Sequence, residues 1–209
     1  MASLNRTCTE THPAPYPRER LRTADSAEPF HYDTMADETI AVLEAIGGPS
    51  HIVGWSDGGN IELIVAIRRP DLVKRLVVIG SNFRYDGIDL SRGGIDLISM
   101  TINDQGKQGL FGDYASNSPD GPSHYDMFIE KTLKMWASEP NLTLDDLSTI
   151  KVPVLVLVGD HDWVHWPHTI ALHENISGAQ LAVVPGAGHA VPLQRPDKVA
   201  QIIDDFLTQ

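Results

Sequence analysis

Cysteine, basic charge and long apolar runs are all scarce in this sequence. Its 209 residues contain one cysteine, Cys8, which excludes an internal disulfide framework and fits a reducing compartment. Lysine and arginine number 16 against 28 aspartates and glutamates, and this acidic balance, without a basic stripe, disfavours a nucleic-acid partner. The longest apolar run, 152–158, is too short to span a membrane, and the N-terminus lacks the apolar core of a signal peptide. We therefore expect a cytoplasmic protein that binds neither nucleic acid nor membrane.

Helical and strand-like patterns alternate along most of the chain. Residues 1–32 carry little hydrophobic periodicity and are predicted to form an irregular N-terminal arm. Asp33 or Thr34 is expected to cap the first helix. The alternation predicts an α/β protein with a mostly parallel sheet and helices on both faces. The predicted strands are 51–55, 76–79, 152–158 and 180–184, and the predicted helices are 34–46, 60–68, 167–175 and 196–207.

A polar, glycine-rich stretch, residues 84–148, interrupts this alternation. Its helical pattern is clearest at 125–137. We interpret the stretch as a small helical cap inserted into an α/β core made of residues 33–83 and 149–209. A flexible surface excursion is the alternative interpretation of the same composition.

The first candidate site is the pentapeptide Gly54-Trp55-Ser56-Asp57-Gly58, which fits G-x-S-x-G between a predicted strand and a predicted helix. A serine on such a tight turn projects its hydroxyl clear of the sheet, and small residues two positions away on either side avoid a clash. The free amides and positive dipole of the following helix point toward the serine, so the Asp57 N–H can donate to an oxyanion. An ordinary glycine-rich turn is the alternative.

Two further motifs follow predicted strands. Gly159-Asp160-His161-Asp162 comes directly after 152–158, where the carboxyl end of a parallel strand faces the ligand-binding side of the sheet. Gly186-Ala187-Gly188-His189 comes after 180–184 on a loop of small residues. Taken singly, the aspartates could be turn formers and the histidine structural. Together with Ser56 they give the chain order serine, acid, histidine, in which the histidine deprotonates the serine and the acid orients and stabilises the histidine.

These motifs resemble those of the α/β-hydrolase family, carboxylesterase type, from about Asp25 to Gln209. GWSDGG resembles the nucleophile elbow, VPVLVLVGDHDWV the acid strand, and PGAGHAVPLQRPDKV the histidine loop with the last helix. The resemblance implies hydrolysis of small-molecule carboxylic esters, without a cofactor, by Ser56, Asp162 and His189. It leaves Asp160 as a turn or supporting residue. It does not separate ester hydrolysis from perhydrolysis, lactone opening or C–C hydrolysis.

Asp57 and Trp55, the neighbours of Ser56, are candidate oxyanion or substrate-binding residues. GWSDGG is also similar to the elbow of the valacyclovir hydrolase (biphenyl hydrolase-like) branch, in which the acidic residue pairs with a substrate α-amino group. That similarity implies that Asp57 selects amino-acid esters; the alternative is a solvated or helix-capping carboxylate. The tryptophans could line an acyl pocket or lie in the core; they are Trp55, Trp136, Trp163 and Trp166.

A metal site is not expected. Four histidines lie near Asp162 in the sequence, but their spacing matches no zinc motif and no cysteine assists them. We interpret them as surface or cap-facing residues: His161, His165, His168 and His173.

The family's N-terminal strands have no readable counterpart before Ser56. Residues 17–25 look like a degraded D-x-R-G-x-G-x-S loop, with Glu19 and Leu21 where glycines are usual. The loop that supplies the second oxyanion amide in the family is expected to be absent, which predicts reduced activity. The strand before Ser56 should also become an exposed sheet edge through which copies of the chain could pair. The competing hypothesis is a catalytically weak or inactive remnant that binds a ligand or partner.

Overall fold

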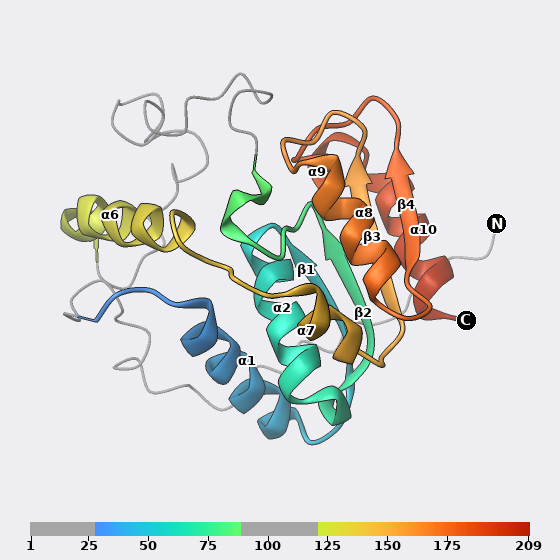
Figure 1. Cartoon of the computed structure of the whole chain (residues 1–209), viewed down its shortest axis with the longest axis horizontal. Coiled ribbons are helices and arrows are strands. Elements are labelled where there is room, and N and C mark those ends of the chain that lie inside the picture. Colours follow the sequence, from blue (N-terminus) through green and yellow to red (C-terminus); the bar gives the residue numbers. More distant parts are fainter. Residues whose placement is uncertain (1–27, 89–120) are drawn as a thin grey trace.

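The computed structural model describes residues 28–88 and 121–209 of the chain (Figure 1). Its strands are β1 (Ser50–Trp55), β2 (Val73–Ile79), β3 (Val154–Gly159) and β4 (Gln180–Val184). Its α-helices are α1 (Tyr32–Ile46), α2 (Asp57–Arg68), α6 (Tyr125–Trp136), α7 (Leu144–Thr149), α8 (Trp166–Asn175), α9 (Val191–Gln194) and α10 (Pro196–Leu207). Short 3-10 helices are η2 (Pro70–Leu72), η3 (Tyr85–Gly87) and η4 (Pro122–His124).

The four strands form one parallel sheet in the order β1-β2-β3-β4. In the register, Ile52 lies opposite Leu76, Leu76 opposite Val154, and Leu157 opposite Ala182. The carboxyl ends of parallel strands meet at one edge of a sheet, which brings the turns after β1, β3 and β4 together. The predicted α/β class with a parallel sheet is therefore confirmed.

The side chains of the central strands alternate between two hydrophobic clusters, one on each face of the sheet. Leu76 and Val78 of β2 pack with α1, α2, α7 and α8, whereas Val77 and Ile79 pack with residues of α9 and α10. Figure 1 shows α1, α2 and α7 on one side of the strands and α10 on the other. A strand covered on both faces has to be apolar at every position, which is why these segments read as unbroken apolar runs.

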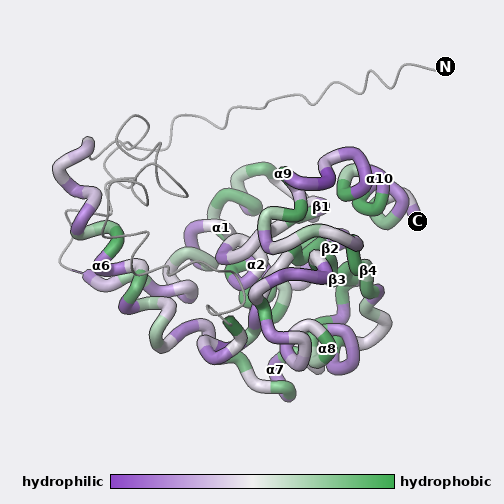
Figure 2. The backbone as a smooth tube through the Cα atoms, turned by 90° about the horizontal axis from the view of Figure 1, so that it is seen from above, coloured by the Kyte–Doolittle hydropathy of each residue, from purple (hydrophilic) through white to green (hydrophobic). Residues whose placement is uncertain are grey.

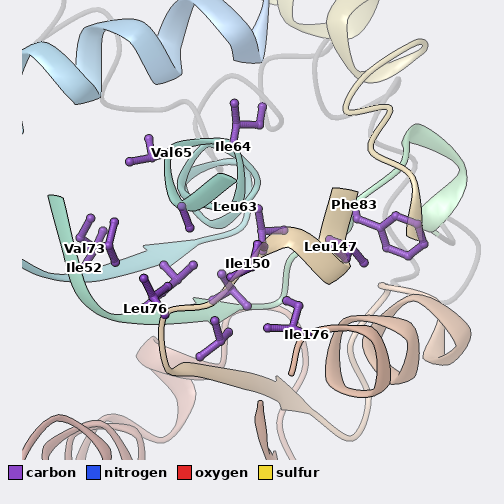
Figure 3. Packing of buried hydrophobic residues seen from close by; sticks show 14 of the residues in the cluster. Ile52, Leu63, Ile64, Val65, Val73, Leu76, Phe83, Leu147, Ile150 and Ile176 are labelled. Carbon is purple, nitrogen blue, oxygen red and sulfur yellow. The ribbon is translucent and has the colours of Figure 1, made fainter. Parts of the chain in front are cut away.

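The larger cluster fills the space between the sheet and α2, α7 and α8 (Figure 3). Leu63, Leu76, Leu147 and Ile150 have no exposed surface. Each such side chain contributes about 1.5–3 kcal/mol through removal from water. Leu147 belongs to the stretch predicted as a cap insertion, so the end of that stretch packs into the core.

Helix α10 covers the other face and is strongly amphipathic. Val199 and Phe206 are buried against the sheet, with Ile202 and Ile203 packed beside them. Figure 2 shows α10 as a mixture of hydrophobic and hydrophilic segments. Pro196 occupies its first position, where the missing N–H leaves no hydrogen bond unmade.

Several element boundaries differ from the sequence prediction. Helix α1 begins at Tyr32 with His31 at the N-cap, and no side chain caps it, so the prediction that Asp33 or Thr34 caps this helix is wrong. Helix α2 starts at Asp57 rather than at residue 60. The two glycines at 58 and 59 belong to its first turn, although their residue type is typical of a loop. Strand β2 starts at Val73 rather than at residue 76. Lys74 and Arg75 interrupt the apolar pattern at its start, so hydrophobicity alone does not reveal these first residues of the strand.

Two other sequence predictions concern regions that the structure covers only in part. Most of the predicted arm lies outside the described residues, and so do 89–120 of the predicted cap. Within the described ranges, β1 has one paired neighbour, β2, and is an edge strand whose Val53 is 47% exposed. No helix in 28–88 or 121–209 is both long enough and apolar enough to cross a membrane.

Candidate active site

Ser56 stands on a strained turn between β1 and α2. Its φ of 56° and ψ of −123° make it the only residue other than glycine with positive φ in the described part of the chain. A Cβ on Gly54 would lie 2.6 Å from backbone atoms of Gly58, and one on Gly59 would lie 1.9 Å from the Ser81 hydroxyl oxygen. Close packing thus requires glycine at 54 and 59, whereas a Cβ on Gly58 would meet nothing within 4 Å, so the clash expected at that position is not found.

The structure brings Ser56, His189 and Asp162 together, although they come from three separate turns. The Ser56 Oγ lies 2.9 Å from the His189 Nε2, and the His189 Nδ1 lies 3.0 Å from the Asp162 Oδ1. The side chains of His189 and Asp162 are 11% and 2% exposed. A proton on Nδ1, donated to Asp162, leaves Nε2 free to accept the serine proton.

The Asp162 carboxylate is itself fixed by the backbone. Its Oδ1 also accepts a hydrogen bond from the Val164 N–H at 3.0 Å. Gly80, at the end of β2 with φ 56°, packs beside it, and a Cβ there would lie 2.9 Å from the Asp162 Oδ2 and 3.0 Å from the His189 Nδ1. A side chain at position 80 would therefore clash with both groups, and glycine leaves the space in which Asp162 and His189 contact each other.

Two tryptophans hold His189 in place. The Trp55 indole N–H donates to the His189 carbonyl at 2.9 Å, and the Trp163 ring centroid lies 4.4 Å from the imidazole centroid. Trp163 is buried. Trp55 thus contacts the histidine backbone, a role that its position next to Ser56 did not suggest.

Asp160 ties the acid turn to the histidine loop. Its Oδ1 accepts from the Ala187 N–H at 3.2 Å and contacts the exposed His161 ring, and the hydrogen bond from His161 is the main cause that lowers the pKa of Asp160. The His161 N–H in turn donates to the Ala187 carbonyl at 2.9 Å. These contacts fit the supporting role predicted for Asp160.

The Asp57 N–H lies in the first turn of α2, where a helix has no internal acceptor for its amides. An oxyanion at Ser56 would meet this donor and the positive end of the helix dipole. Residues 17–25, which resemble a degraded D-x-R-G-x-G-x-S loop, lie outside the described residues.

The Asp57 side chain is held by two other helices. Its Oδ1 accepts from the Tyr32 hydroxyl at 2.6 Å, and the Trp136 indole N–H lies 2.9 Å from Oδ2 and 3.1 Å from Oδ1. Burial raises the pKa of Asp57, whereas both hydrogen bonds lower it. Burial is also the main cause that raises the pKa of Tyr32, and the Asp57 carboxylate adds to it. Sequence reasoning missed Tyr32 because it assigned residues 1–32 to an irregular arm.

A pair of buried asparagines connects α2 with the segment after β2. The Asn60 Nδ2 donates to the Asn82 Oδ1 at 3.2 Å, and the Asn82 N–H donates back to the Asn60 Oδ1 at 3.0 Å. Asn60 also reaches the Tyr32 hydroxyl at 3.5 Å.

Within the described residues, no group of three or more histidine, cysteine or acidic side chains is placed to hold a metal ion.

The sequence profile of the alpha/beta hydrolase family matches residues 13–202. Among relatives, the mouse (Mus musculus) protein serine hydrolase BPHL is 25% identical over 221 residues, which cover 99% of this chain and 72% of the relative. Pimeloyl-(acyl-carrier protein) methyl ester esterase of Neisseria meningitidis serogroup C is 28% identical over 208 residues, which cover 88% of this chain and 78% of the relative.

Solved structures share the fold at low sequence identity. The enol-lactonase from Burkholderia xenovorans LB400 matches with a TM-score of 0.65 and 17% identity, covering 88% of this chain and 76% of that chain. A meta-cleavage product hydrolase from Pseudomonas fluorescens IP01 matches with a TM-score of 0.64 and 21% identity, covering 88% and 74%. At this identity the likeness extends to the fold alone.

Proposed function

Because this chain belongs to the alpha/beta hydrolase family, we propose that it is a serine hydrolase that cleaves carboxylic esters of small molecules. The observation that carries the proposal is the imidazole of His189, which lies within hydrogen-bond distance of both Ser56 and Asp162. The names of two relatives, a serine hydrolase and a methyl ester esterase, agree with this chemistry.

In the proposed acylation step, the Ser56 Oγ attacks the ester carbonyl carbon while its proton passes to the His189 Nε2. Asp162 keeps the imidazole oriented and stabilises the imidazolium. The carbonyl oxygen becomes an oxyanion that accepts from the Asp57 N–H. When the tetrahedral intermediate collapses, the C–O bond to the alcohol breaks and His189 returns the proton to the departing alkoxide oxygen.

Deacylation repeats these steps with water. His189 removes a proton from water, the hydroxide oxygen attacks the acyl carbon, and the Ser56 oxygen leaves and recovers the proton. A carboxylic acid and free enzyme result, without a cofactor. A single missing oxyanion donor typically lowers turnover by about 10²- to 10³-fold, so turnover depends strongly on whether a second donor joins Asp57.

The proposal is tested by labelling the folded protein with a fluorophosphonate probe, which reacts with activated serines. We expect the wild type to be labelled and Ser56→Ala to remain unlabelled. Ser148→Ala, which changes an exposed serine of α7, serves as the matched control and should label like the wild type. Absent labelling of folded wild type, or labelling that survives in Ser56→Ala, would contradict the proposal and favour a non-catalytic binding protein.

A further inference from the structure

Asp57 stands where three separate parts of the chain meet. It is the first residue of α2, its carboxylate accepts from Tyr32 at the start of α1, and it also accepts from Trp136 at the end of α6. The partners are 25 and 79 residues away in the sequence. Figure 1 shows α6 at the margin of the core, joined to α7 by an extended stretch. This carboxylate therefore connects α6 to the serine turn.

Trp136 also reaches the histidine side of the site. Its ring packs against the small cluster of Trp163 and Val164, and the Trp163 ring in turn contacts the His189 ring at a tilt of 39°. Trp136 thus contacts Asp57, next to Ser56 in the sequence, through its N–H, and it contacts Trp163, which packs on His189, through its ring. A displacement of Trp136 would change the space beside both reacting groups.

We propose that Asp57 is a positioning residue that fixes Trp136 of α6 beside the serine turn and thereby sets the acyl-binding space, and that it is not a receptor for a substrate amino group. This inference rests on the proposed esterase function. It identifies the preferred substrates as esters whose acyl group carries no ammonium, because the protein itself supplies partners for the acidic side chain.

The hydrogen-bond inventory of the carboxylate supports this assignment. An ionised carboxylate offers about four acceptor positions. The Tyr32 hydroxyl and the Trp136 indole take both acceptor positions of Oδ1 and one of Oδ2, through contacts of 2.6, 3.1 and 2.9 Å. About one acceptor position, on Oδ2, is left for a substrate ammonium, beside two donors that the fold already holds.

The Tyr32 donor is buried and anchored by its backbone. The residue is 2% exposed, and its backbone N–H donates to the Glu139 carboxylate at 2.9 Å, just beyond the end of α6. Phe30, just before α1, and Phe128, in the first turn of α6, add an edge-to-face ring contact with centroids 5.8 Å apart. The segment around the start of α1 therefore contacts α6 near its beginning and just beyond its end, as expected of a structural junction.

The decisive variant is Asp57→Asn, assayed with p-nitrophenyl butyrate and with a valine ester paired with its N-acetylated analogue. Asparagine keeps an oxygen that can accept from both Tyr32 and Trp136 but loses the charge that an ammonium needs. We expect the ratio of kcat/KM between the free-amine ester and its N-acetylated analogue to stay within about twofold of the wild-type ratio. A loss of about 100-fold in kcat/KM confined to the free-amine ester would overturn the proposal.

Removing the contact should affect substrate binding more than chemistry. For Trp136→Phe, which deletes the N–H and keeps an aromatic ring, and for Asp57→Ala, we expect KM for p-nitrophenyl butyrate to rise about fivefold with kcat within about twofold. The KM of the double variant should be no higher than that of Asp57→Ala alone, because the two changes remove the same interaction. An unchanged KM in Trp136→Phe, or additive losses in the double variant, would refute the assignment.

Hydrogen exchange separates this inference from the proposed function, since it needs no turnover. In Trp136→Phe and in Asp57→Ala, amides of α6 should exchange about tenfold faster than in wild type. Tyr85→Phe, which removes the hydroxyl of an exposed tyrosine, is the matched control for Tyr32→Phe, and only Tyr32→Phe should speed exchange in α6. Unchanged α6 exchange in all three variants overturns the positioning contact, whether or not Ser56 labels.

Discussion

Glu62 of α2 should make the folded protein less stable as the pH rises. Its side chain is largely buried, its Oε2 has no hydrogen-bond partner, and burial raises its pKa from 4.5 to about 7. A pKa that is higher in the folded than in the unfolded chain means that folding binds a proton. The stabilising contribution is therefore complete below pH 4.5, declines between 4.5 and 7, and is absent above 7.

The size of the effect follows from these two pKa values. At about 1.4 kcal/mol for each pH unit, the interval from 4.5 to about 7 corresponds to about 3 kcal/mol. Because the side chain keeps some contact with solvent, we expect a measured difference of about 2 kcal/mol. Most of that change falls between pH 4.5 and pH 7, so measurements at pH 5 and pH 8 bracket nearly all of it.

The perturbation is Glu62→Gln, which keeps the shape and removes the charge. Urea unfolding followed by circular dichroism at pH 5 and at pH 8 gives the free energy of unfolding for variant and wild type. The free energy of unfolding of the variant minus that of the wild type should be about 2 kcal/mol larger at pH 8 than at pH 5. Glu38→Gln makes the same change on an exposed face of α1 and controls for the loss of net charge. Equal gains of Glu62→Gln at both pH values would refute the reasoning.

Two more predictions concern the site and the sheet edge. Gly80→Ala should lower ester turnover at least about tenfold, because the new Cβ would enter the contact between Asp162 and His189. Gly178→Ala is the control: this glycine also has a positive φ, but a Cβ there meets nothing within 4 Å. The control variant should lose stability without losing turnover. If Gly178→Ala loses as much turnover as Gly80→Ala, the steric explanation fails. The exposed edge predicts self-association that light scattering detects as a mass rising with concentration, and Val53→Lys should reduce it. A constant monomer mass would contradict that prediction.

The sheet could be predicted because its strands carry their own signals. The run 154–159 is apolar at nearly every position, as a strand buried on both faces must be, and 180–184 and 196–207 have the observed limits of β4 and α10. The chain order of the strands and the parallel pairing then place the three turns at one sheet edge. Their meeting in space follows from topology, not from any contact pattern between them.

Side-chain partners that depend on helix placement could not be predicted. Nothing local marks Tyr32 as buried, because a tyrosine between histidine and aspartate at the end of a polar segment resembles a loop residue. Its burial results from α1 packing on α2, which places its hydroxyl on Asp57. The Trp136 N–H meets the same carboxylate only because the chain returns from α6 to the core beside α2.

This difference bears on how far an elbow motif can specify a substrate. A G-x-S-x-G sequence followed by an acid fixes the backbone of that acid at a helix start, but it leaves open which donors reach the carboxylate. Here the donors come from α1 and α6, and they turn a group that could bind an ammonium into one that is already bound. On our proposal the acid of this hexapeptide positions a helix and does not select a substrate amine. Its role would then depend on the residues at the positions of Tyr32 and Trp136 as much as on Asp57 itself.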